Sequence, residues 1–433
     1  MQGIEHKNQV ERDIFHVMMR RPGPIYWAAL GLSAGGFLML LFLWSKIIFQ
    51  GMGVLGLNHP VGWAVLITDF VFWVGIAHSG TLISAILFLF RAKFRNRFNR
   101  SAEAMTVFAI MVAGLFPLLH LGRVWLAYTL MPYPNQRQLW VNFRSPLLWD
   151  VFAVSTYFTV SAVFFYVGLI PDLASARQHA TGIRRWAYRI FSLGWTGSAD
   201  QWRHYNKLYG LLACFATPLV VSVHSIVSWD FAMSIIPGWH TTIFAPYFVA
   251  GAIFSGCGMV ITLVVLMRKI FGLENYITVK HFESLAQVLL LTSLIVTYAY
   301  IVEFCLAFYT GDKFEISHFT YRFFGDYRYL AWMMLFCNSV LPLTLFLRKL
   351  RTSIPYLFVL SLFVNVGMWL ERFVIIVTSL ARDFDPYNWG LYRPTYVEIG
   401  ITVGSFGMLF MLFLLFVKAL PVLSVTELKE EHA

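Results

Sequence analysis

Long apolar runs recur from near the start of this sequence to near its end, and each is about as long as a lipid bilayer is thick. Hydrophobic residues make up 58% of the chain and charged residues only 13%, whereas a soluble domain has roughly 45–50% and about 25%. We therefore predict an all-α integral membrane protein with about ten transmembrane helices. The predicted helices lie near residues 26–49, 61–90, 104–131, 147–170, 208–236, 243–270, 284–310, 327–347, 355–381 and 396–420.

The basic residues indicate how the helices are oriented. The net charge is +11, and the 33 Lys and Arg residues concentrate in alternate loops, on the same side as both termini. By the positive-inside rule, both termini are expected in the cytoplasm. This distribution explains the basic charge without nucleic acid. It predicts a cytoplasmic segment at 1–25, a membrane domain at 26–420 and a cytoplasmic tail at 421–433.

The ends of the chain and its longest loop carry two further expectations. The first residues are polar and have no small-residue cleavage site after an apolar core, so we expect no signal peptide. The loop 171–207 is predicted to be cytoplasmic and interfacial. Its stretch RQHATGIRRWAYRIFSLGW alternates Arg with aromatic and aliphatic residues, as an amphipathic helix lying on a membrane surface does.

The cysteine pattern argues against metal cofactors in this chain. All four cysteines fall inside apolar runs, and the sequence has neither C-x-x-C nor C-x-x-C-H. We therefore expect no iron–sulfur cluster, zinc site or c-type haem here.

Ionisable residues inside the predicted helices require an explanation, because each central charge costs roughly 2.5–3.5 kcal/mol in lipid. With the orientation above, most of them fall in the outer half of the membrane. A structural ion-pair network and a buried pocket that handles protons both account for them. These residues are Asp69, His78, His120, Arg123, Asp150, His224, Asp230, Glu303, Glu371, Arg372 and Glu398.

The best candidates for a proton-handling pocket lie where neighbouring helices meet. His120 ends one predicted helix and Asp150 begins the next, while Asp230 lies one and a half turns beyond His224. A segment rich in Pro, Arg and aromatic residues (131–150) would roof such a pocket with flat surfaces suited to a ring-shaped ligand. Arg372 is expected to pair with carboxylates, whereas its neighbour Glu371 is expected to point elsewhere on the helix.

His78 and His224 lie near mid-membrane and allow several interpretations. Two histidines on facing helices are compatible with a b-type haem, with hydrogen bonds between helices, or with a proton wire that includes Asp69 and the carboxylates. The sequence leaves these alternatives open.

Several long motifs resemble a known family of membrane subunits. The resemblance extends over nearly the whole chain, to the NrfD-type subunits of quinone-linked complexes and, within them, to the quinol-site membrane subunit of bacterial alternative complex III. The motifs are VFWVGIAHSGTLISAILFLFR (71–91), AGLFPLLHLGRVW (113–125), YPNQRQLWVNFRSPLLWDVFAVSTYF (133–158), GLIPDLASAR (168–177), SVHSIVSWDFA (222–232) and MWLERFVI (368–375).

The resemblance implies a fold and a site. Predicted helices two to five and six to nine would form two four-helix bundles, the first holding a quinol pocket near the periplasmic face. His120, Asp150, Asp230 and Arg372 stand at the family's quinol-site positions. A proton route would include His78 and His224, to which the argument from buried charges adds Asp69 and Glu303. The ligand would be a quinone or quinol of the menaquinone type, and the subunit would hold no haem or cluster.

The resemblance also implies partners and a location. In a bacterial cytoplasmic membrane, electrons would pass to an iron–sulfur subunit on the periplasmic side and then to c-type cytochrome subunits. A second NrfD-like membrane subunit and other small membrane subunits would complete the complex, in contact with lipid and without nucleic acid. Two rival functions remain at this point. One is a secondary transporter or ion pathway, and the other is a non-catalytic anchor of the same complex.

Overall fold

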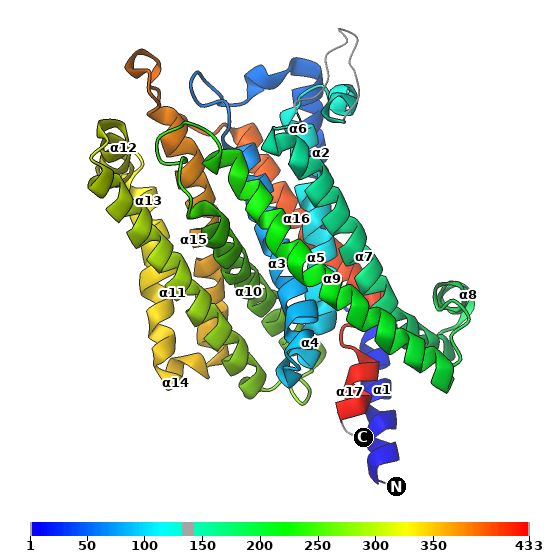
Figure 1. Ribbon diagram of the computed structural model, residues 1–433. Helices are drawn as coiled ribbons and strands as arrows, with labels where there is room; N and C mark the ends of the chain where they lie inside the picture. Colours follow the sequence, from blue (N-terminus) through cyan, green and yellow to red (C-terminus); the bar gives the residue numbers. More distant parts are fainter. Residues whose placement is uncertain (1, 132–142, 432–433) are drawn as a thin grey trace.

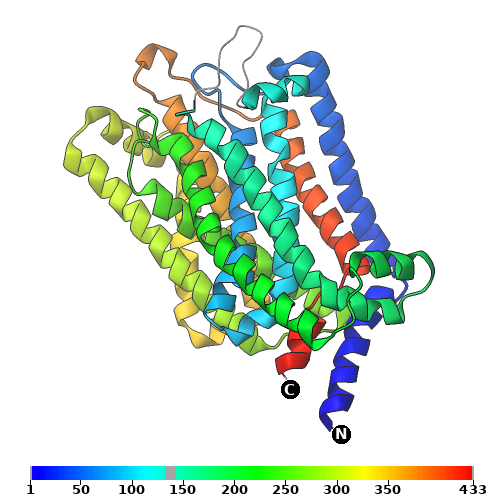
Figure 2. The same cartoon turned by 45° about the vertical axis from the view of Figure 1, so that its right-hand side comes forward.

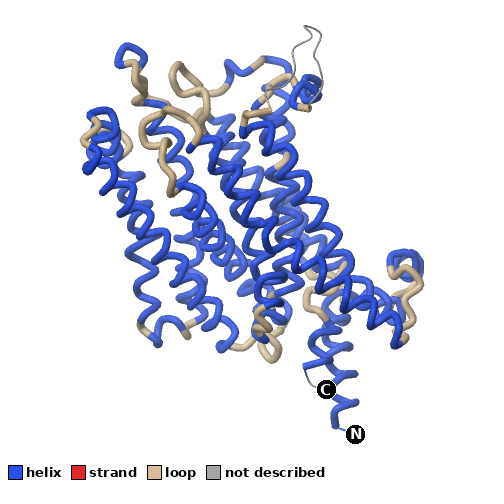
Figure 3. Tube along the Cα trace, viewed as in Figure 1, coloured by secondary structure: helices blue, strands red, loops and turns tan. Residues whose placement is uncertain are grey.

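The computed structural model describes residues 2–131 and 143–431, and every regular element in these ranges is a helix (Figure 3). Ten of the helical segments are long and apolar enough to cross a membrane. The prediction of an all-α protein with about ten spans is confirmed. Part of the expected roof segment, residues 132–142, lies outside the described residues.

The spans run alternately up and down between two ends of the bundle (Figure 1). Both termini lie at one end, and we call the opposite end the distal end (Figure 2). The first four-helix unit comprises α3 (Val65–Thr81) with the π-helix η2 (Leu82–Ile86) and α4 (Leu87–Leu89), α5 (Asn99–Ala113) with α6 (Leu115–His120), α7 (Pro146–His179) and α9 (Ala199–Ala232).

The second four-helix unit follows directly in the chain. It comprises α10 (Phe244–Phe271), α11 (Val279–Thr310), α13 (Arg328–Leu335) with the π-helix η5 (Phe336–Val340) and η6 (Leu341–Phe346), and α15 (Ile354–Ala381). The two remaining spans, α2 (Pro24–Gln50) and α16 (Tyr396–Ala419), pack on each other beside the first unit. Short helices connect the spans: η1 (Met52–Val54), η3 (Lys93–Arg97), η4 (Val124–Leu130), α12 (Lys313–Phe324), α14 (Arg348–Arg351) and η7 (Pro386–Asn388).

Several helix ends differ from the expected ones. The third span begins at Asn99 rather than near 104 and ends at His120, after which the separate 3-10 helix η4 continues to Leu130. The spans α7 and α9 have 34 residues each, about 51 Å at 1.5 Å per residue, so they extend past the bilayer at the end that carries the termini. Much of the expected loop 171–207 is therefore helical.

Between α7 and α9 lies α8 (Gly182–Phe191), inside the segment expected to be interfacial. Its Ile183, Trp186 and Ile190 are exposed, whereas Tyr188 is buried and donates a hydrogen bond to the Ala419 carbonyl. Exposed apolar residues at this spacing form one face of a helix, which is what a membrane-surface anchor requires.

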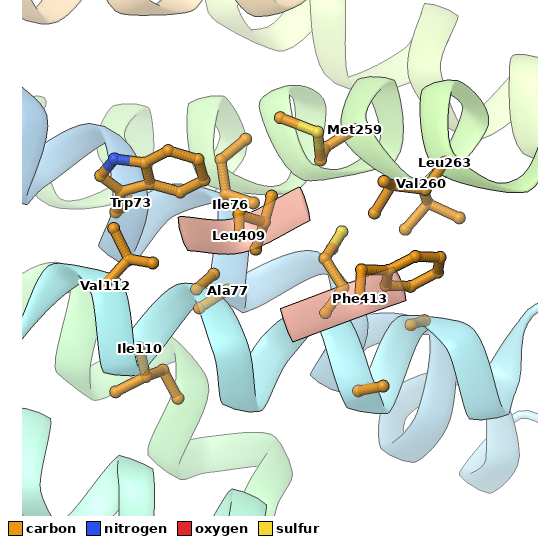
Figure 4. Packing of buried hydrophobic residues seen from close by; sticks show 14 of the residues in the cluster. Trp73, Ile76, Ala77, Ile110, Val112, Met259, Val260, Leu263, Leu409 and Phe413 are labelled. Carbon is orange, nitrogen blue, oxygen red and sulfur yellow. The ribbon is translucent and has the colours of Figure 1, made fainter. Parts of the chain in front are cut away.

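The core is built where α3 lies between α5, α10 and α16. Figure 4 shows Trp73 and Ile76 of α3 with Leu409 of α16 next to Ile76 and Val112 of α5 on the same side as Trp73. In this apolar interior, close packing of side chains stabilises the helices, because lipid does not supply the hydrophobic driving force that water provides for soluble proteins.

One helix crossing in this core depends on a glycine. A Cβ atom on Gly80 of α3 would overlap both the Thr106 hydroxyl and the Ala102 carbonyl of α5. The Thr106 hydroxyl already donates a hydrogen bond of 2.7 Å to the Ala77 carbonyl, so it has little freedom to move away.

Replacing Gly80 by Ala should therefore destabilise the protein by about 1–3 kcal/mol, as overpacking of a closed interior does. Thermal unfolding of the purified protein in detergent measures this effect. Gly31→Ala on α2 is the matched control, because nothing lies within 4 Å of the added methyl group. Equal unfolding temperatures for the two variants would contradict the prediction.

Two further helices flank the spans at the end of the bundle that carries the termini. The N-terminal helix α1 (Gln2–Met19) buries Ile14 and Phe15, and the C-terminal helix α17 (Val425–Glu431) buries Leu428. Lys429 forms an ion pair with Glu11, which joins the two terminal helices.

Candidate functional site

Asp150 and Asp230 come together at the distal end of the first four-helix unit. Pro146 at the first position of α7 places Asp150 in the second turn, and Asp230 lies in the last turn of α9, the antiparallel neighbour of α7. The two carboxyl groups are within hydrogen-bonding reach of each other. The adjacent rings of Trp149 and Trp229 meet edge to face at 6.1 Å between centroids, which fixes the same two helix ends.

This pair is arranged to bind and release a proton. A hydrogen bond between two carboxyl groups requires a proton on one of them. The Oδ1 atoms of Asp150 and Asp230 are buried and have no partner among the described residues. Buried polar atoms without a partner are costly, so a shared proton or a ligand's hydroxyl group would stabilise these oxygens.

His120 lies at the same end of the unit as the carboxyl pair. It ends α6 and is half-buried, and its Nδ1 has no hydrogen-bond partner in the described part of the chain. No hydrogen bond or ion pair joins it to Asp150 or Asp230 within residues 2–131 and 143–431. Residues 132–142 connect the two helices that carry His120 and Asp150.

His78 and His224 form a contact pair deeper in the unit. Their ring centroids are 4.6 Å apart with an angle of 55° between the ring planes, and both residues are buried. The Nδ1 of His78 is bonded to the Val74 carbonyl, so this nitrogen carries the hydrogen. Rings in direct contact leave no room for a porphyrin plane between them, so the geometry disfavours the haem interpretation.

Tyr157 and Thr81 continue the polar path from the histidine pair towards the other end of the bundle. The Tyr157 ring lies 4.9 Å from His78 between centroids, and its hydroxyl is 2.8 Å from the Thr81 hydroxyl. Next to them is a small cavity of about 10 Å³, room for about one water molecule, which Ser161 and Glu103 also line. Neither Tyr157 nor Glu103 was predicted, because Tyr157 is one of many aromatic residues in its apolar run and Glu103 lies just before the predicted start of the third span.

A buried ion network stands at the far end of this path. Arg100 donates hydrogen bonds to Asp172 at 2.8 Å, to Glu103 at 3.0 Å and to the Gly168 carbonyl at 2.6 Å. Tyr209 donates a further one to Glu103 at 3.1 Å. Arg100 precedes the predicted third span and was expected in a loop, but it is 2% exposed.

Arg372, expected near the quinol-site carboxylates, is instead paired within the second unit. Its Nη1 lies 3.1 Å from Oε1 of Glu371, and both side chains are buried. The expectation that Glu371 points elsewhere is therefore wrong. Tyr300 donates a hydrogen bond to Glu371, and Asn338 of the π-helix η5 donates one of 3.0 Å to the Tyr300 hydroxyl. The guanidinium also packs 4.1 Å from the centre of the Phe248 ring.

Two other buried carboxylates have structural partners. Asp69 accepts hydrogen bonds of 2.7 Å from the Trp369 indole and from the Thr402 hydroxyl, which ties α3 to α15 and α16. Glu398 accepts from the backbone nitrogens of Gly56 and Thr395, and so caps the start of α16. Both oxygens of Asp69 are occupied, and it lies apart from the His78 pair. Glu303 lies in the second unit and lines a cavity there.

Within the described residues, no group of three or more His, Cys, Asp or Glu side chains is arranged to hold a metal ion.

The chain was compared with known proteins and families. A family model described as polysulphide reductase, NrfD, matches residues 53–382, which span both four-helix units. The chain belongs to the NrfD family. This NrfD protein is accordingly a multi-pass membrane protein among the quinone-interacting subunits of oxidoreductase complexes.

Two relatives align with this NrfD chain over nearly the full length of both proteins. A putative dimethyl sulfoxide reductase membrane subunit of Halobacterium salinarum is 26% identical over 89% of this chain and 90% of its own. A selenate reductase subunit of Mesobacillus selenatarsenatis is 23% identical over 88% and 91%. The Hdr-like menaquinol oxidoreductase integral membrane subunit of Archaeoglobus fulgidus is 22% identical over 39% of this chain and 40% of its own.

Proposed function

We propose that this chain is the quinol-binding subunit of a respiratory or photosynthetic oxidoreductase complex, and that it oxidises menaquinol at the distal end of its first four-helix unit. The observation that carries the proposal is the buried Asp150–Asp230 pair, in which the Oδ1 atom of each carboxyl group lacks a hydrogen-bond partner among the described residues. A quinol releases two protons when two electrons leave its ring, so its site needs groups that accept protons where the ring binds.

In this proposal the chain's residues bind the ring and take its protons. Asp150 accepts one hydroxyl proton, and His120 accepts the other through its free Nδ1. Asp230 shares the proton taken by Asp150 and passes it on. The two electrons go to a partner subunit, because the cysteine pattern provides no cluster in this chain. Arg372 has a positioning role in this proposal, through its ion pair with Glu371 in the second unit.

The proton route proposed from here runs through His224 and His78. Below the histidines, Tyr157, Thr81 and the one-water cavity lead to Glu103. Chains of hydrogen-bonding side chains and water of this kind carry protons in membrane pumps. With the distal end facing the periplasm and both termini in the cytoplasm, the same route would serve translocation across the bilayer.

The partners we propose are an iron–sulfur subunit at the periplasmic side, c-type cytochrome subunits, a second NrfD-like membrane subunit and other small membrane subunits. This is the alternative complex III arrangement in a bacterial cytoplasmic membrane. The similarity to subunits of a dimethyl sulfoxide reductase and a selenate reductase favours a second candidate, the membrane subunit of a terminal reductase complex. Quinol oxidation by this chain is common to both candidates, and they differ in the partner that receives the electrons.

The proposal is tested on the intact complex purified through this chain. A menaquinol analogue should reduce the iron–sulfur clusters of the partner subunit, as followed by electron paramagnetic resonance. A haem c absorption band in the same preparation supports the alternative complex III arrangement, whereas its absence supports the reductase. An intact complex without bound quinone and without cluster reduction would leave only the structural anchor. Cation flux through the chain reconstituted alone in vesicles would favour the transporter.

A further inference from the structure

A second cavity lies in the other half of the molecule, near the distal end. It has a volume of about 310 Å³ and is enclosed by α10, α11, α12, α13 and α15. Most of its lining is aromatic or aliphatic, and its polar groups come from Tyr247, Tyr300, Glu303 and Arg322. Glu303 is seven residues before Thr310 at the end of α11, so the cavity is about 10 Å below the distal end of that helix.

The polar groups of this cavity are buried and incompletely bonded. Oε1 of Glu303, Nη2 of Arg322 and the hydroxyl of Tyr247 have no hydrogen-bond partner within the described residues. These residues are only 5%, 3% and 1% exposed. No ion pair within 4 Å joins Glu303 to Arg322 in the described part of the chain, although both face the same cavity. Such groups are costly unless something bonds to them, and a ligand in the cavity would do so.

The cavity borders the side of the bundle rather than the aqueous end. Ile301 and Phe304 of α11, Phe324 of α12 and Trp332 of α13 line it and are themselves 45–71% exposed. Ile301, Phe304 and Trp332 lie on the outward faces of spans that lipid covers in a membrane, and Phe324 ends the connecting helix α12 beside them. A ligand therefore reaches the cavity from the hydrocarbon, and an apolar tail remains in lipid after the head group has bound.

We propose that this cavity binds a second quinone, by its ring, with Arg322 and Glu303 as the two head-group ligands. A para-quinone carries two oxygens on opposite sides of a flat apolar ring. Arg322 supplies a donor for one oxygen, and Glu303 supplies an acceptor for the hydroxyl of the reduced form at the other. The aromatic lining suits the ring faces, and the volume is at the lower end of ligand pockets, about 300–1,000 Å³.

The charges in the cavity argue against a phospholipid. A phosphate group would pair with Arg322, but it would also meet the carboxyl group of Glu303 in a low-dielectric interior. A donor and an acceptor facing one cavity match a neutral ligand with two oxygens better than an anion.

This inference rests on the proposed function only for the class of ligand. The second cavity is in the other four-helix unit from Asp150, and no residue is shared between them. It adjoins the Glu371–Arg372 pair through Tyr300, which both lines the cavity and donates a hydrogen bond to Glu371. A quinone ring bound in the cavity would thus contact Tyr300, which is bonded to the Glu371–Arg372 pair.

Photolabelling of the complex in its native membrane tests the proposal. The probe is an azido-naphthoquinone with a short isoprenyl tail, and the labelled peptides are identified by mass spectrometry. Label is expected on peptides of α11 and α12 as well as on those of α7 and α9. Arg322→Gln removes a charge-assisted hydrogen bond, so it should reduce labelling of α11 and α12 by about tenfold or more and leave α7 and α9 labelled.

Two further variants separate binding from folding. Ile301→Trp adds bulk at the exposed rim without touching a buried polar group, and it should reduce the same label. Arg328→Gln is the matched control, because Arg328 is exposed on α13 and packs on the Tyr329 ring. Unchanged labelling of α11 and α12 in both Arg322→Gln and Ile301→Trp would overturn the second site. So would a wild-type complex that retains phospholipid but shows no label on α11 and α12. Label on α11 and α12 but none on α7 and α9 would instead overturn the proposed first site.

Discussion

Replacing Asp150 by Asn is expected to lower quinol-dependent electron transfer by about 10²-fold or more, the usual contribution of a positioned proton acceptor. The amide keeps the size of the carboxyl group but cannot take a proton from a ring hydroxyl. In the proposed site Asp230 shares a proton with Asp150, so Asp230→Asn should have an effect of the same order. The measurement is the rate at which a menaquinol analogue reduces the partner's clusters in the purified complex.

The double variant sharpens this test. Because the two carboxyl groups act as one proton-binding unit, Asp150→Asn with Asp230→Asn should be little slower than either single variant. Asp200→Asn is the matched control, since Asp200 is exposed and only pairs with Arg203 on the surface. If Asp150→Asn gives an assembled complex that turns over at the wild-type rate, the carboxyl pair is not the proton acceptor.

The ten spans were predictable because the bilayer sets a length that each apolar run has to meet. The meeting of Asp150 and Asp230 was also within reach of the sequence. One lies near the start of a span and the other near the end of a later span, so both were expected at the same membrane face. That these two helices pack side by side depends on tertiary structure, which apolar runs without an amphipathic pattern do not reveal.

The pairing of Arg372 with Glu371 shows where such reasoning fails. Adjacent residues on a helix diverge from the backbone, and this divergence led to the expectation that they do not meet. Long side chains overcome it when packing confines them, and here α10 approaches so closely that a Cβ on Gly251 would lie 2.9 Å from Nη2 of Arg372. Such an approach is decided by the neighbouring helix, not by local sequence.

The buried network around Arg100 was missed for a different reason. Basic residues that precede an apolar run are normally exposed to water, and Arg100 lies just before the predicted start of the third span. Its partner Asp172 is 72 residues further along the chain. The C-terminal helix α17 then covers the network, since Thr426 donates two hydrogen bonds to Asp172.

Replacing Arg100 by Met should destabilise the protein by about 3–5 kcal/mol, the usual cost of removing one member of a buried ion pair. The change leaves the carboxyl groups of Glu103 and Asp172 buried without their common cation. Arg100→Lys should restore only part of the loss, because an ammonium group lacks the planar fork that reaches several acceptors. The unfolding temperature of the purified complex reports the effect.

The segment that unfolds first in Arg100→Met distinguishes the loss of this ion network from a general loss of stability. Asp172 holds Thr426, and Glu427 forms an ion pair of 2.9 Å with Arg95, so disturbing the network should release α17 before the spans unfold. Hydrogen exchange in residues 425–431 should rise in Arg100→Met while exchange in α3 stays slow. Arg203→Met, which removes an exposed surface pair, should change neither quantity measurably.

Because the cost arises from unpaired carboxylates, Arg100→Met combined with Glu103→Gln and Asp172→Asn should be more stable than Arg100→Met alone. If the triple variant were less stable, the role of Arg100 would be packing rather than charge compensation.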